Sequence, residues 1–105
     1  MHKYAFLVGC SEYEHLTPLP FVVNDVREFG TVLQEVCGFE VVQTCVGQEA
    51  MHSDLEDRVD RFFSAPYPPG TLLLLYFSGH GLLDGNTQGF LACYNTHRKV
   101  LLIKY

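Results

Sequence analysis

Residues 71–81, TLLLLYFSGHG, constrain the fold of this chain more than any other stretch. The apolar and aromatic run at 72–77 has no polar alternation, which is typical of a strand covered on both faces in a parallel sheet. The run ends at Ser78, and two glycines then flank His80. In open parallel sheets, ligands and chemistry gather beyond the carboxyl ends of the strands. His80 therefore lies where a general base is useful, and its glycine neighbours allow a close backbone approach.

Other apolar runs predict further strands. Residues 4–8 predict a central first strand that ends at Gly9, and residues 39–46 predict a second strand nearer the edge of the sheet. Residues 90–94 predict a fourth strand, and residues 100–103 form another apolar run. With the second strand on one side of the first and the 71–81 stretch on the other, the carboxyl end of the first strand lies beside His80.

Two helices are predicted between these strands. The first carries apolar residues at spacings of three and four and stops at Gly38, a common C-capping residue. The second opens with a capping box, Ser53 and Glu56, and stops before Pro66. The residues expected on the buried faces are Val22, Val26, Phe29, Leu33 and Val36 in the first helix and Leu55, Val59, Phe62 and Phe63 in the second. This order of elements predicts an α/β fold with a mostly parallel sheet and helices on both faces.

Composition excludes several classes of function. A chain of 105 residues suits one small domain, and a net charge of −5 without a Lys/Arg cluster argues against nucleic-acid binding. Neither a signal peptide nor a membrane span is evident, so we expect a cytoplasmic protein without a membrane partner. Cys10, Cys37, Cys45 and Cys93 form no CxxC pair, which predicts packed, reduced thiols and no metal site. One alternative is a flavodoxin-like binding domain, which the absence of a Gly-rich phosphate cradle in the first loop argues against, and we expect no cofactor.

A catalytic histidine needs a partner. The chain has no G-x-S-x-G nucleophile elbow, whereas a thiol is a natural partner because an imidazole favours the nucleophilic thiolate. The topology brings only Cys10 near His80, and the favoured interpretation of Cys10 is a small core residue. For His80 itself, the alternative is a turn histidine that forms only local hydrogen bonds.

Several segments together resemble a known family. AFLVG in the first strand, NDVREF in the first helix, CGFEVV, DRFF and YFSGHG follow one another as in the caspase-like cysteine peptidases. The prokaryotic caspase homologues, metacaspases and paracaspases are the most similar branches. The resemblance implies that residues 1–105 are the amino-terminal part of one caspase-like (caspase-haemoglobinase) domain, an incomplete three-layer α/β sandwich. It also implies a cysteine-type endopeptidase with a Cys–His dyad.

The resemblance assigns roles to three residues. It implies that His80 is the dyad histidine and that the backbone N–H of Gly81 stabilises the oxyanion. Asp25 matches the acidic residue that pairs with a substrate Arg or Lys before the cleaved bond. The alternative for Asp25 is a first-turn residue that complements the helix dipole. Asp84 is a weaker candidate for binding substrate or a cation, and an exposed turn residue is its favoured interpretation.

The resemblance stops short of the nucleophile. In caspase-type sequences the cysteine lies about 50 residues after the histidine, which is beyond Tyr105. Residues 97–105 also form an atypical tail. We therefore expect the chain to be inactive alone. The expected partners are a carboxyl-terminal caspase-like subunit or a second copy of the chain, and the expected substrate is a peptide or protein. The alternative is a non-catalytic pseudo-peptidase fragment that acts as an interaction or regulatory domain through an uncovered sheet edge.

Overall fold

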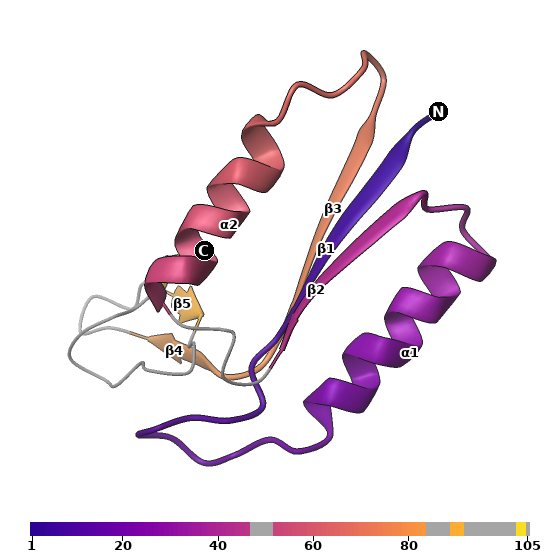
Figure 1. The fold of residues 1–105 in the computed structure, drawn as a ribbon. Coiled ribbons are helices and arrows are strands. Elements are labelled where there is room, and N and C mark those ends of the chain that lie inside the picture. Colours follow the sequence, from indigo (N-terminus) through magenta and orange to yellow (C-terminus); the bar gives the residue numbers. More distant parts are fainter. Residues whose placement is uncertain (47–51, 84–88, 92–102, 105) are drawn as a thin grey trace.

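The computed structural model describes residues 1–46, 52–83, 89–91 and 103–104. The elements are β1 (Lys3–Gly9), α1 (Val22–Glu35), β2 (Val41–Val46), α2 (His52–Ser64), β3 (Leu72–Ser78), β4 (Gly81–Leu83), β5 (Gly89–Leu91) and β6 (Ile103–Lys104) (Figure 1). Strands β2, β1 and β3 form a parallel sheet in that order, as the sequence predicted. Strands β4, β5 and β6 form a separate antiparallel sheet that the sequence did not predict.

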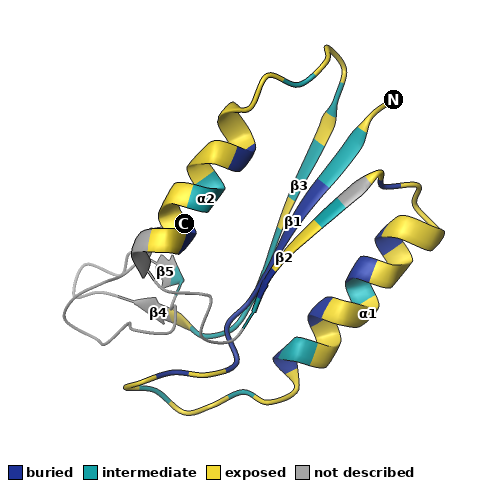
Figure 2. Ribbon diagram, in the orientation of Figure 1, coloured by how far each residue is buried: buried dark blue, intermediate teal, exposed yellow. Residues whose placement is uncertain are grey.

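Strand β1 is the centre of the fold and is covered on both faces (Figure 2). Successive side chains of a strand point to opposite faces, so β1 supplies two layers of core. One cluster contains Ala5 and Leu7 of β1 with Val22, Val26 and Leu33 of α1. The other contains Phe6 and Val8 of β1 with Leu55 and Phe62 of α2. One helix therefore lies on each face of the parallel sheet, which is the predicted three-layer arrangement.

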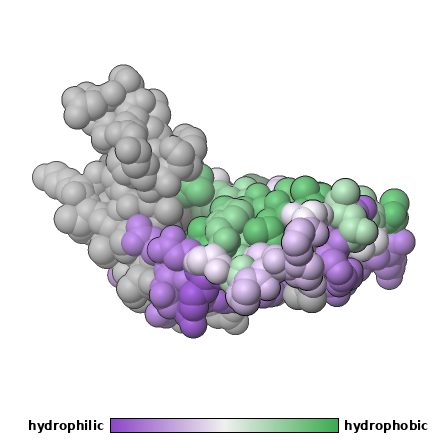
Figure 3. Space-filling view, turned by 90° about the horizontal axis from the view of Figure 1, so that it is seen from above, coloured by the Kyte–Doolittle hydropathy of each residue, from purple (hydrophilic) through white to green (hydrophobic). Residues whose placement is uncertain are grey.

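The burial expected for β3 is wrong. No residue of β3 is buried, and the side chains of Leu72 and Leu75 are 46% and 37% exposed. The physical reason is its position: β3 pairs with β1 on one side, and within the described residues no strand pairs with its other edge. Figure 3 shows hydrophobic residues gathered into one continuous area of the surface. The unbroken apolar run thus predicted the strand correctly, but it did not predict how far the side chains of the strand are buried.

The helix ends and faces differ in detail from the prediction. Val36 follows the end of α1 and is exposed, and α2 begins at His52, so Ser53 lies inside the helix and is not its N-cap. Phe63 is exposed because successive helical residues are about 100° apart, and Phe62 already occupies the core side. Neither described helix has the length and apolar character needed to cross a membrane.

Candidate active site

Parallel pairing brings the carboxyl ends of β1 and β3 side by side. Gly9 is in register with Ser78, and the backbone N–H of Cys10 donates to the Ser78 carbonyl at 2.9 Å. The pairing therefore continues one residue beyond β1. His80 follows β3 by two residues and lies at this same end of the sheet, as its position in the sequence predicted.

The loop that leaves β1 holds the imidazole of His80. The Nε2 atom of His80 lies 2.8 Å from the backbone carbonyl oxygen of Thr17. A carbonyl oxygen only accepts, so this hydrogen bond requires a proton on Nε2. In the neutral ring, Nδ1 is then the nitrogen with the free lone pair. His80 is half-buried, so the ring is not enclosed in the core.

A tyrosine of the same loop contacts both the backbone and the ring of His80. The hydroxyl oxygen of Tyr13 accepts from the backbone N–H of His80 at 3.0 Å. The two rings meet in an edge contact, with centroids 4.9 Å apart and planes inclined by 60°. Sequence reasoning missed both loop residues. Thr17 acts through its main chain, which no residue type signals, whereas an aromatic side chain in a polar loop was a usable signal for Tyr13.

The other two predicted site residues lie near the same end of the sheet. Gly81 is the first residue of β4, is exposed, and follows His80 directly in the chain. Asp25 is exposed in the first turn of α1. That turn packs on the carboxyl end of β1, because a Cβ at Gly9 would lie 3.0 Å from a methyl carbon of Val22 in the first turn and 2.7 Å from one of Val26 just after it. This location suits both the pocket role and the helix-dipole role of Asp25.

No described cysteine presents an exposed thiol beside His80. Cys10 lies beside the end of β3, two residues before His80, because its backbone bonds Ser78. Its side chain, however, is fully buried in the core on the α2 side, as is that of Cys45. Cys37 is exposed, but it lies at the opposite end of the sheet, where its carbonyl accepts from Nζ of Lys3 at 2.8 Å. Cys37 is a free thiol. Two further candidates, Asp84 and Cys93, lie outside the described residues.

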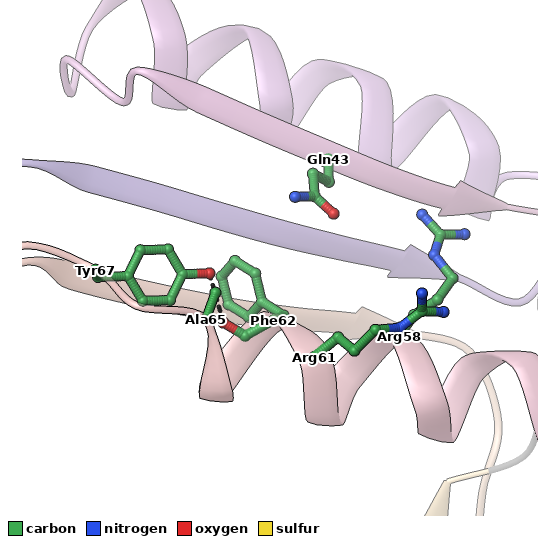
Figure 4. A pocket seen from close by; sticks show the side chains of 6 residues that line it. All are labelled: Gln43, Arg58, Arg61, Phe62, Ala65 and Tyr67. Carbon is green, nitrogen blue, oxygen red and sulfur yellow. Dashed lines mark hydrogen bonds between the residues drawn. The ribbon is translucent and has the colours of Figure 1, made fainter.

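A separate pocket of about 310 Å³ lies between α2 and β2 (Figure 4). Its lining residues are Gln43, Arg58, Arg61, Phe62, Ala65 and Tyr67, none of which belongs to the predicted site. Both guanidinium groups are already engaged. Arg58 donates to the Thr44 carbonyl at 3.3 Å and stacks over the Phe6 ring, and Arg61 pairs with Asp57 at 2.5 Å. Within the described parts of the chain, no three His, Cys, Asp or Glu side chains group closely enough to hold a metal ion.

The comparisons with known proteins agree with this arrangement. The family model of the caspase domain, Peptidase C14, matches residues 2–104. The chain therefore belongs to the caspase family. A parallel sheet with one helix on each face, ending in a histidine held at the strand ends, is consistent with that membership. A search of curated proteins finds no match.

Proposed function

We propose that this chain supplies the histidine-bearing part of a cysteine endopeptidase that cleaves after Arg or Lys. The observation that carries the proposal is the hydrogen bond between Nε2 of His80 and the Thr17 carbonyl. This bond leaves Nδ1 as the basic nitrogen at the carboxyl end of a parallel sheet, where a substrate has access. The cysteine nucleophile comes from a segment outside the described residues, since the described thiols are buried or lie at the far end of the sheet.

The proposed reaction has two halves, formation of a thioester on the cysteine and hydrolysis of that thioester, and His80 transfers protons in both. Nδ1 of His80 takes the thiol proton, and the thiolate attacks the carbonyl carbon of the substrate peptide. The backbone N–H of Gly81 stabilises the oxyanion, and the Thr17 carbonyl stabilises the imidazolium through a charge-assisted hydrogen bond. The imidazolium then protonates the leaving amine as the C–N bond breaks. Water, activated by His80, hydrolyses the thioester and restores the thiol.

We expect Asp25 to set the preference for a basic substrate residue. In the complete peptidase, meaning this chain joined to the segment that carries the cysteine, Asp25→Asn should lower kcat/KM for an Arg-containing peptide by about 10- to 100-fold, because a charge-assisted pair is lost. Cleavage rates of matched Arg and Leu peptides measure the effect. Glu28→Gln is the control. Glu28 is also an exposed acidic residue of α1, and its carboxylate accepts a hydrogen bond from the side chain of Asn24 on the same helix. Equal losses in both variants, or equal cleavage of both peptides, would contradict the assignment.

The open edge of β3 favours a second candidate, an interaction domain without catalysis. Leu72 and Leu75 are exposed at a strand edge that has no described partner strand, and such edges pair readily with another chain. The proposed partner is a complete caspase-like relative that adds a strand to β3. Leu75→Lys should then weaken the affinity of this association at least tenfold in sedimentation measurements. Val32→Lys, at an exposed position of α1, should leave the affinity unchanged. A chain that stays monomeric and binds no such relative would count against this candidate.

A further inference from the structure

We infer that Tyr13 is a positioning residue that fixes the backbone at His80 and so sets the place of both the imidazole and the following Gly81 amide. The contact itself is independent of any activity. Its importance for catalysis depends on the proposed function, in which His80 is the base and Gly81 the oxyanion donor.

The backbone amide of His80 depends on Tyr13 for its hydrogen bond. Strand β3 ends at Ser78 and β4 begins at Gly81, so His80 lies between the two sheets and outside both ladders. A backbone N–H in such a place needs a partner from elsewhere. The Tyr13 hydroxyl oxygen supplies it at 3.0 Å, from a residue 67 positions earlier in the chain.

Tyr13 is a rigid anchor for this bond. Its side chain is 9% exposed and packs in the core cluster that contains Phe6 and Leu55. Its ring also contacts the His80 imidazole in an edge arrangement, with the ring centroids 4.9 Å apart. Together with the Thr17 carbonyl at Nε2, the loop therefore restrains His80 at its backbone, through a ring contact and at one ring nitrogen.

The glycine before His80 makes room for the tyrosine hydroxyl. A Cβ built on Gly79 would lie 2.6 Å from the Tyr13 hydroxyl oxygen and 3.1 Å from Cβ of Cys10. Real Cβ atoms do not approach an oxygen so closely. The first glycine of the SGHG segment is thus complementary to Tyr13.

One tether can align two catalytic groups because they are consecutive in the chain. The Tyr13 bond fixes the amide of His80, from which the imidazole projects and to which the Gly81 amide is joined. Loss of the tether should misplace the base and the oxyanion donor together. Because both act in the transition state, the loss should lower kcat rather than raise KM.

The first test uses nuclear magnetic resonance on the 105-residue chain with Tyr13→Phe. Phenylalanine keeps the ring, so changes in the ring-current shifts of the imidazole protons report movement of His80 and not the loss of its neighbour. We expect those shifts to change and hydrogen exchange of the His80 amide to accelerate about tenfold, the usual worth of one hydrogen bond. Tyr67→Phe is the matched control, because the Tyr67 hydroxyl also bonds the backbone, at the Phe62 carbonyl, away from His80. Unchanged shifts with exchange within twofold in Tyr13→Phe would overturn the inference.

A second test separates the inference from the proposed function. In the complete peptidase, Tyr13→Phe should lower kcat about tenfold with KM for a basic peptide within twofold, while Tyr67→Phe leaves both unchanged. A loss through KM alone would overturn the positioning role. A complete protein without any peptidase activity would refute the proposed function, and the resonance measurements would still decide whether Tyr13 restrains His80.

The packing of Tyr13 on Gly79 gives a third measurement. Gly79→Ala should lower the urea midpoint of unfolding, because the new methyl group collides with the Tyr13 hydroxyl. The same substitution in the Tyr13→Phe background should lower the midpoint by less, since the closest contact of the new methyl group, with the Tyr13 hydroxyl, is gone. Strictly additive effects would contradict the close contact on which the inference depends.

Discussion

Replacing His80 by alanine is expected to lower kcat/KM of the complete peptidase by about 10²- to 10⁴-fold, the usual contribution of a general base. Alanine has no group that can take the thiol proton or return it to the leaving amine. His80 is half-buried at the end of the sheet and outside the core clusters, so the variant should fold normally. The loss should therefore be in the chemical step.

Initial rates with a fluorogenic Arg peptide measure this effect, and circular dichroism checks the fold. His15→Ala is the control, because His15 is in the same loop, is half exposed and lies 3.5 Å from its neighbour Glu14. We expect its activity to remain within twofold of the native value. Full activity of His80→Ala, or an equal loss in both variants, would refute the assignment of His80 as the catalytic base.

Phe6→Ala should reduce the free energy of unfolding by about 3–5 kcal/mol, the range found for a fully buried phenylalanine. Phe6 is fully buried in the middle of β1. Its ring contacts the edge of Phe62 at 5.8 Å between centroids and lies beneath the guanidinium of Arg58. The substitution leaves a cavity between the sheet and α2. Because small domains are stable by only about 5–15 kcal/mol, a loss of this size removes much of the total.

Urea unfolding followed by far-ultraviolet circular dichroism gives the free energy of each variant. Phe21→Ala is the control, since Phe21 is 58% exposed at the start of α1. This surface substitution should change the free energy of unfolding by about 0.5 kcal/mol or less. Similar losses for the two phenylalanines would contradict the description of β1 as the core of the fold.

Local patterns predicted most of the parallel layer. The apolar run before Gly9, the helical periodicity that contains Val22 and Val26, and the unbroken run before Ser78 each depend on neighbours within a few residues. Such signals also placed His80 at the carboxyl end of a strand. At the second sheet, the predicted strand at 90–94 overlaps β5, but β4 and the antiparallel pairing were missed, because strands of two or three residues are too short to show a period.

Burial and the support of the site depend on contacts that no local pattern encodes. The apolar run of β3 is the same whether a further strand covers its edge or not, so only the tertiary structure shows that Leu72 and Leu75 are exposed. The partners of His80 come from positions 63 and 67 residues away. The amino-acid sequence thus determined which strand carries the imidazole and where it ends. Only the tertiary structure decided which groups hold that imidazole. Packing sets the path of the loop that brings Tyr13 and Thr17 to His80, and Thr17 acts through a main-chain oxygen that every residue has.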